Sequence, residues 1–107
     1  MRRNKQRENV TIEDLCLTNP RLLFLIEEEN KRQLEKWGVQ ICSPFAWHTF
    51  LAEEVGETAK AISEYIYRNG SSSRVVFEAI QAATLSLKIA EMFLAVLKEE
   101  ANHENAD

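Results

Sequence analysis

Glycine, proline and cysteine are all scarce in this chain of 107 residues. It contains only three glycines and two prolines, a composition that favours long uninterrupted helices. It has no alternating strand pattern, no internal repeat and no glycine-rich nucleotide-binding loop, which argues against β-rich and dinucleotide-binding folds. The two cysteines, Cys16 and Cys42, lack the spacing of metal ligands. We therefore expect them to be reduced thiols with a structural role.

The charge balance gives no case for a nucleic-acid partner, because the net charge is −4. The one basic run lies within residues 1–10, which we expect to form a disordered, solvated tail. The sequence has 45% hydrophobic and 28% charged residues, as an ordinary soluble domain does. With no signal peptide and no apolar run judged long enough to span a membrane, we expect a cytoplasmic protein without a membrane partner.

The capping signals divide the chain into helices. Thr11 and Asp14 resemble a capping box and predict a short helix over residues 11–17. Asn19-Pro20 predicts the start of a helix that ends near residue 37, before Gly38. A loop follows, and Ser43-Pro44 starts a second long helix that reaches residue 68. A break over residues 69–73 precedes a third helix over residues 74–100. We thus expect one domain over residues 11–100 and a disordered C-terminal tail over residues 101–107.

The third predicted helix is apolar on almost every side. Two other long helices cannot easily cover such a surface, so a partner subunit is the simplest source of the missing cover. We expect an all-α fold with four-helix-bundle-like packing around a helical hairpin, completed as a homodimer or homotetramer.

Acidic residues interrupt this apolar pattern at regular spacings. Glu54 shares a helical face with aromatic and aliphatic residues, and Glu57 follows it at a spacing of three. Glu78 and Gln81 repeat that spacing in the third helix. If the two helices pack antiparallel, these oxygen-bearing side chains can surround one point. Oxygen ligands of this kind suit Mg²⁺, with Mn²⁺ as a substitute.

The spacing alone is equally compatible with an ordinary polar seam. In that interpretation the acidic face is solvated, Glu54 pairs with Lys60 or another basic residue, and the protein is a structural helical oligomer. The sequence pattern leaves both interpretations open.

Taken as a whole, residues 29–97 resemble the MazG-like nucleoside triphosphate pyrophosphohydrolases. Three blocks carry the resemblance: Arg32-Gln33-x-x-Lys36-Trp37-Gly38, Trp47-x-x-Phe50-Leu51-x-Glu53-Glu54-Val55-Gly56-Glu57-x-x-Lys60-Ala61, and Glu78-x-x-Gln81-Ala82-Ala83. The resemblance implies a small all-α enzyme that uses Mg²⁺ to hydrolyse a nucleoside or deoxynucleoside triphosphate to the monophosphate and pyrophosphate. Removal of unwanted nucleotides would be its role.

The resemblance also implies roles for individual residues. Glu54, Glu57, Glu78 and Gln81 would bind the metal, and either Glu53 or Glu57 would orient or deprotonate the attacking water. Gln81 departs from the family pattern, which usually has aspartate at this position. The amide removes one negative charge from the site, so a catalytically degenerate protein that binds nucleotide or metal without turnover is the alternative.

Six further residues are candidates for contacts with the substrate. Lys36, Lys60 and Lys88 could contact phosphates, although Lys60 and Lys88 could equally form salt bridges. Trp37 could stack on a base, as could Trp47, but tryptophan at a helix end more often seals a core. Gln33 could hydrogen-bond a base edge or lie on the surface.

Overall fold

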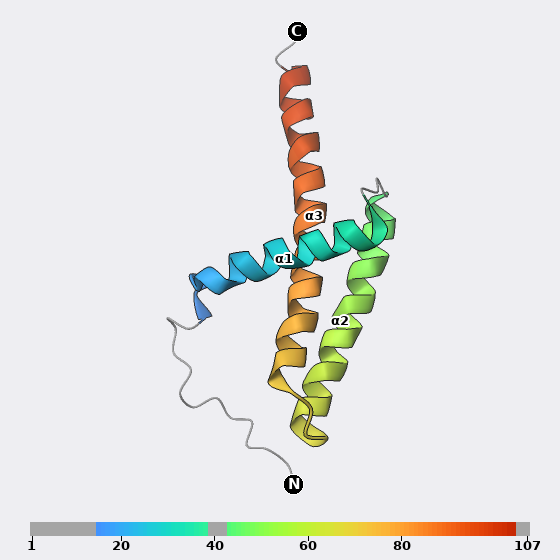
Figure 1. The fold of residues 1–107 in the computed structure, drawn as a ribbon. Coiled ribbons are helices and arrows are strands. Elements are labelled where there is room, and N and C mark those ends of the chain that lie inside the picture. Colours follow the sequence, from blue (N-terminus) through green and yellow to red (C-terminus); the bar gives the residue numbers. More distant parts are fainter. Residues whose placement is uncertain (1–14, 39–42, 105–107) are drawn as a thin grey trace.

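The computed structural model describes residues 15–38 and 43–104, which form three helices (Figure 1). They are α1 (Pro20–Trp37), α2 (Pro44–Tyr67) and α3 (Ser72–Glu104). The prediction of an all-α fold is confirmed. The predicted tail at residues 1–10, most of the predicted helix at 11–17 and Cys42 lie outside the described residues, and residues 15–17 are not α-helical.

The two predicted helix starts at proline are confirmed. The side chain of Asn19 accepts a hydrogen bond from the backbone nitrogen of Arg21 at 2.9 Å, and Pro20 follows at the first position of α1. The side chain of Ser43 accepts from the backbone nitrogen of Ala46 at 3.2 Å, directly before Pro44. Each cap satisfies a backbone donor that has no partner within its helix.

A glycine lies directly beyond the end of α1, and another lies three residues beyond the end of α2. Gly38 has a φ of 74°, and its nitrogen donates to the carbonyl oxygen of Leu34 at 2.7 Å. After α2, the backbone nitrogen of Gly70 donates to the Glu64 carbonyl oxygen at 2.9 Å. A Cβ atom at Gly70 would lie only 3.1 Å from the Glu64 carbonyl carbon, so the chain can turn closely here because the residue has no side chain.

Helix α3 is longer than predicted at both ends. Ser71 Oγ accepts from the backbone nitrogen of Arg74 at 3.2 Å, so the helix begins at Ser72 rather than at residue 74. It ends at Glu104, and residues 101–104, predicted to belong to a disordered tail, form its last turn. Their polar composition indicated solvent exposure, which a helix that projects into solvent also provides.

Helix α3 is the element on which the other two pack. Helices α2 and α3 form the predicted antiparallel hairpin, whereas α1 crosses α3 (Figure 1). Within the described part of the chain, α1 packs against α3 but not against α2. The C-terminal half of α3 extends beyond both partners (Figure 1).

The interior of this arrangement is mainly polar. Among the described residues, the buried apolar side chains are Ala61, Ile80 and Leu85. The buried polar side chains are Glu29, Gln33, Glu78, Gln81 and Thr84. Many large apolar side chains are instead exposed, as we expect for a chain that another surface completes.

The prediction that no apolar run is long enough to span a membrane is wrong for α3 by length and composition. The helix contains an 18-residue window with a mean hydropathy of 1.5, long and apolar enough to cross a membrane by those criteria alone. The core helix of a soluble protein passes the same test, although only 17% of this window is buried within the chain.

Candidate functional site

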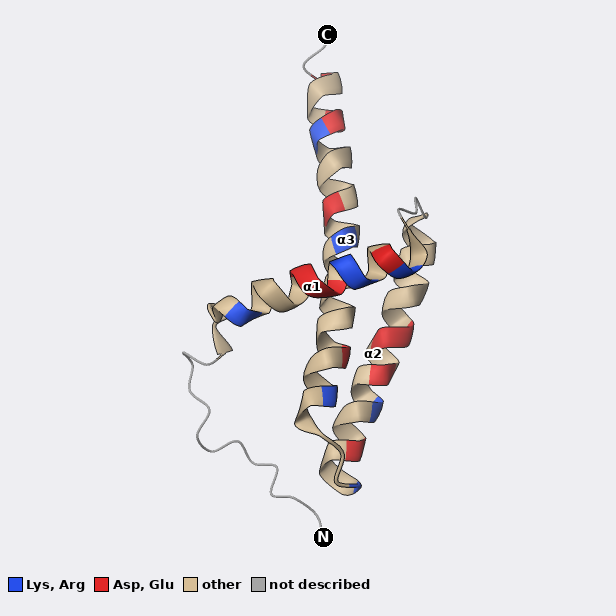
Figure 2. Cartoon of the chain, viewed as in Figure 1, with Lys and Arg blue, Asp and Glu red and all other residues tan. Residues whose placement is uncertain are grey.

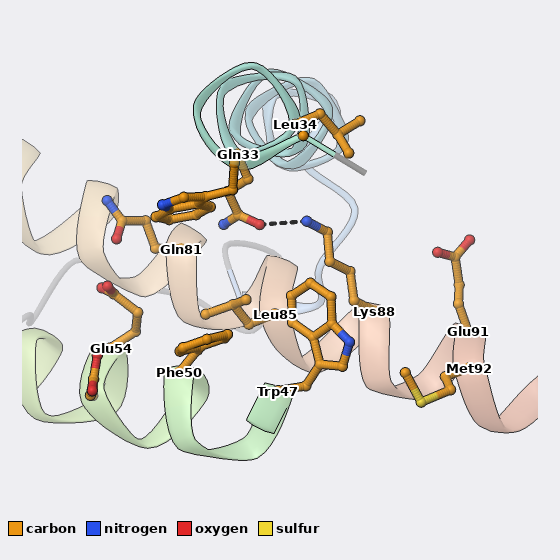
Figure 3. Close-up of a pocket in the computed structure, with 13 residues that line it drawn as sticks. Gln33, Leu34, Trp47, Phe50, Glu54, Gln81, Leu85, Lys88, Glu91 and Met92 are labelled. Carbon is orange, nitrogen blue, oxygen red and sulfur yellow. Dashed lines mark hydrogen bonds between the residues drawn. The ribbon is translucent and has the colours of Figure 1, made fainter. Parts of the chain in front are cut away.

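A chain of polar contacts fastens α1 to α3. The Arg32 guanidinium binds the Glu29 carboxylate with two hydrogen bonds, at 2.9 and 2.8 Å. Gln33 Nε2 donates to the same carboxylate at 2.7 Å, and Gln33 Oε1 accepts from Lys88 Nζ at 2.6 Å (Figure 3). Both oxygens of the Glu29 carboxylate therefore accept hydrogen bonds, and Gln33 is held in one orientation between an anion and a cation.

A second polar cluster joins α2 to α3. The amide of Gln81 faces the carboxylate of Glu54, and its nitrogen donates at 2.7 and 3.0 Å to the two carboxylate oxygens. Figure 3 draws the amide in the opposite orientation, which would place oxygen against oxygen. On the preceding turn of α3, Glu78 accepts from Arg74 Nε at 3.2 Å. Glu78 is buried, whereas Arg74 is largely exposed.

The carboxyl group of Glu54 is the most strongly perturbed acid of the site. Burial first, and then a hydrogen bond with Glu78, raise the pKa of Glu54 to about 7. The negative charges of Glu78, Glu57 and Glu29 act in the same direction. No ion pair compensates Glu54 within residues 15–38 and 43–104, so the alternative in which it pairs with Lys60 finds no support there. Glu54 thus carries a charge that a proton or a bound cation can neutralise.

A cavity of 570 Å³ lies beside both polar clusters. Its apolar wall includes Trp47 and Phe50, whose rings meet edge to face with centroids 6.1 Å apart. Glu54 and Gln81 line one part, and Lys88 lines another, with its Nζ 5.3 Å from the centroid of the Trp47 ring (Figure 3). Burial lowers the pKa of Lys88, against the opposing effect of Glu29 and Glu91. The cavity therefore combines flat apolar surface with an acidic region and a basic group.

The structure brings six of the predicted site residues to this cavity. They are Gln33, Trp37, Glu53, Glu54, Gln81 and Lys88. Trp47, the other tryptophan considered for base stacking, lines it as well. Gln33 is buried rather than on the surface.

Four predicted site residues lie elsewhere. Glu57 and Lys60 line a separate pocket of 160 Å³ between α2 and the start of α3. Glu78 pairs with Arg74. The Lys36 ammonium lies 5.0 Å from the centroid of the Trp37 ring and does not line the cavity. Figure 2 shows the acidic residues of α2 spread along the helix. Glu57 lies one turn beyond Glu54, and this step moves it from one pocket to the other.

The oxygen atoms of Glu54, Glu78 and Gln81 are of the kind that binds a hard divalent cation. Glu54 and Glu78 offer carboxylate oxygens, and Gln81 would offer its amide oxygen after a rotation of the amide. Among the described residues, however, no three acidic, histidine or cysteine side chains are arranged closely enough to hold a metal ion. Binding a cation through Gln81 would require its amide to turn so that the oxygen faces the site, while Glu78 pairs with Arg74 through only one of its two carboxylate oxygens.

Sequence reasoning did not assign a role to Glu29, Arg32 or Arg74. Glu29 continues a helical stripe formed by Leu22, Leu25 and Ile26, and a carboxylate in such a position favours a buried partner. Arg32 follows Glu29 at a helical spacing of three, and Arg74 precedes Glu78 at a spacing of four. These spacings are common in solvated helices, so they carried no specific signal.

Comparisons with known protein families, with curated proteins and with solved structures found no match to this chain.

Proposed function

We propose that this protein is a magnesium-dependent nucleoside triphosphate pyrophosphohydrolase of the MazG-like kind. The observation that carries the proposal is the half-buried carboxyl of Glu54, which no ion pair compensates within the described residues, beside Glu78 and Gln81 at the edge of an aromatic cavity. A divalent cation held by these residues would offset their acidity and would supply positive charge for the phosphates of a nucleotide in the cavity.

In this proposal, different parts of the cavity bind the base and the phosphates of the nucleotide. Trp37 and Trp47, with Phe50, provide flat surfaces against which a base can stack. Lys88 supplies positive charge, and Gln33 holds it in place through the 2.6 Å hydrogen bond. Glu54 and Gln81 lie where the phosphates would meet the metal.

When bound, the metal would neutralise charge that develops on the phosphates in the transition state. Glu54, Glu78 and Gln81 would hold it. Glu53, which is exposed and lines the cavity, would orient the attacking water or accept its proton. Glu57 is the less suitable base, because it lines the smaller pocket. The products would be the nucleoside monophosphate and pyrophosphate.

Gln81 supports a second candidate function, a protein that binds nucleotide or metal without turnover. Its amide nitrogen donates to both oxygens of Glu54, so it already satisfies the carboxylate that a metal would otherwise bind. Aspartate at this position would instead repel Glu54 and favour a cation.

Pyrophosphate release from a panel of nucleoside and deoxynucleoside triphosphates, measured with Mg²⁺ and with Mn²⁺, tests the proposal. We expect release from at least one triphosphate, and a loss of about a hundredfold or more in Glu54→Gln and Glu78→Gln. Glu28→Gln is the matched control, since Glu28 is an exposed residue with only a 3.8 Å pair to Lys31.

The panel also separates the two candidates. Activity in Gln81→Asp but not in the natural chain would favour the protein that binds without turnover. An absence of pyrophosphate release from every triphosphate, in both proteins and with both metals, would contradict the enzymatic proposal.

A further inference from the structure

The C-terminal half of α3 carries an exposed apolar stripe with the spacing of a coiled coil. Its residues are spaced alternately three and four apart, and they are Leu87, Ala90, Leu94, Leu97 and Ala101. Leu87, Leu94 and Leu97 are 49%, 63% and 61% exposed. This spacing keeps all five side chains on one side of a helix that packs against another helix. Most of the stripe lies where α3 extends beyond α1 and α2 (Figure 1).

Two opposite charges flank this stripe on the same side. Glu91 follows Ala90 and Lys98 follows Leu97, so the two residues occupy equivalent positions one heptad apart. In an antiparallel pair of identical helices, equivalent flanking positions face each other, and Glu91 of each copy meets Lys98 of the other. In a parallel pair these positions would face Ser86 and Phe93 instead, with no charge pairing. The charges therefore favour an antiparallel arrangement.

We propose that a second copy of this chain packs antiparallel along residues 87–101 of α3. Two such stripes with their flanking side chains together bury on the order of 1,000 Å², the lower range of a specific interface. The pairing covers Leu94 and Leu97, among the most exposed leucines of the helix. It forms two identical charge pairs, as two-fold symmetry requires.

The second copy also contributes to the cavity. Glu91 lines the cavity as well as flanking the stripe. Lys98 of the second copy, paired with Glu91, therefore lies at the cavity wall and adds a positive charge there. Only the use of this charge, as a counterion for phosphates, rests on the proposed function.

Sedimentation velocity of charge variants tests the proposal without nucleotide or metal, so its outcome is independent of enzymatic activity. We expect the natural chain to dimerise. Glu91→Lys and Lys98→Glu should each raise the dimer dissociation constant about tenfold, because each places like charges in both pairs. The double variant should return to within about threefold of the natural chain. An equimolar mixture of the two single variants should also dimerise, since each variant complements the other.

Two controls exclude a nonspecific effect of charge and a loss of helical structure. Glu99→Lys changes the same kind of charge on the side of α3 that faces away from the stripe, and it should leave the dissociation constant within about twofold. Circular dichroism should show the same helix content in every variant, since Glu91 and Lys98 are exposed.

Three results would overturn the proposal. The first is a natural chain that stays monomeric at concentrations of hundreds of micromolar. The second is a double variant that associates no better than the single variants. The third is a natural chain that floats with phosphatidylcholine vesicles instead of dimerising, which would assign the apolar surface of α3 to a membrane.

Discussion

At the scale of single residues, Glu54 is the acid whose pKa the surroundings raise most among the described residues. Its carboxyl lies against Gln81 and Glu78 from α3, and burial is the largest cause of its raised pKa. An acid with a pKa of about 7 is partly protonated under neutral conditions. A proton and a divalent cation would therefore compete for the same position.

Glu54→Gln is predicted to stabilise the metal-free protein at pH 8. Glu54 binds its proton more tightly in the folded chain, with a pKa of about 7, than its ordinary value of 4.5. The protonated carboxyl of Glu54 therefore stabilises the folded chain relative to the ionised form. This stabilisation is fully present below about pH 4.5 and is lost as the pH rises through about 7. Because the carboxyl is only half-buried, we expect a gain of about 1 kcal/mol at pH 8 and almost none at pH 4.5. Urea unfolding at the two pH values measures both.

Glu28→Gln provides the control for this pH dependence. Glu28 is exposed, and its 3.8 Å pair with Lys31 contributes little to folding. Its effect should differ by less than about 0.5 kcal/mol between the two pH values. A Glu54→Gln protein that is less stable than the natural chain at pH 8 would show that the carboxylate is well compensated.

The sequence indicated which polar side chains face inward better than it indicated their contacts. Helical periodicity placed Glu54 on an inward face, and the interruption of an apolar helix singled out Glu78 and Gln81. Periodicity could not show that Glu57 would line a different pocket, since that depends on where α3 diverges from α2. Nor could it show that Arg74 would form an ion pair with Glu78, because a spacing of four is also common between solvated charged residues.

At the scale of helices, the position of α1 depends on polar contacts more than on apolar packing. Gln33 is 3% exposed and joins Glu29 of its own helix to Lys88 of α3. The Arg32 guanidinium adds a contact 5.8 Å from the centroid of the Phe77 ring. Such contacts fix a crossing position, because each buried donor and acceptor has to find its partner.

Gln33→Ala is predicted to loosen α1 from α3. The substitution leaves Lys88 without its acceptor and removes one donor from the buried Glu29 carboxylate. We expect a loss of about 2 kcal/mol in the free energy of unfolding. Hydrogen exchange should also become faster in α1 than in α2, which α1 does not contact within the described residues.

Glu35→Ala is the matched control on the same helix. Glu35 is exposed and should change stability by less than about 0.5 kcal/mol. Equal losses in Gln33→Ala and Glu35→Ala would mean that α1 is held by helix propensity rather than by the contacts of Gln33.

The helices themselves were largely predictable because their ends depend on local chemistry. Asn19-Pro20, Gly38 and Ser43-Pro44 fix backbone geometry within a few residues, and each lies where the structure starts or ends a helix. The crossing of α1 over α3 could not be predicted in this way. It depends on a hydrogen bond between residues 33 and 88, which are 55 positions apart.

At the scale of the whole molecule, a polar interior accompanies an apolar exterior. The buried carboxylates and amides hold the three helices together around the cavity, while α3 leaves much of its apolar surface uncovered. The need for such cover was predictable from the sequence, since α3 is apolar on almost every side. Oligomerisation stays a prediction, and we expect the cover to come from a second copy.

The central claim is that acidic groups of α2 and α3 share a cation that binds a polyphosphate. Crystals soaked with Mn²⁺ and a non-hydrolysable triphosphate analogue test it directly through the anomalous signal of the metal. We predict a peak bounded by oxygens of Glu54, Glu78 and Gln81, with the Gln81 amide turned so that its oxygen faces the metal. A structure with the analogue bound, no peak at this position and Glu54 still bonded to the Gln81 amide nitrogen would contradict the claim.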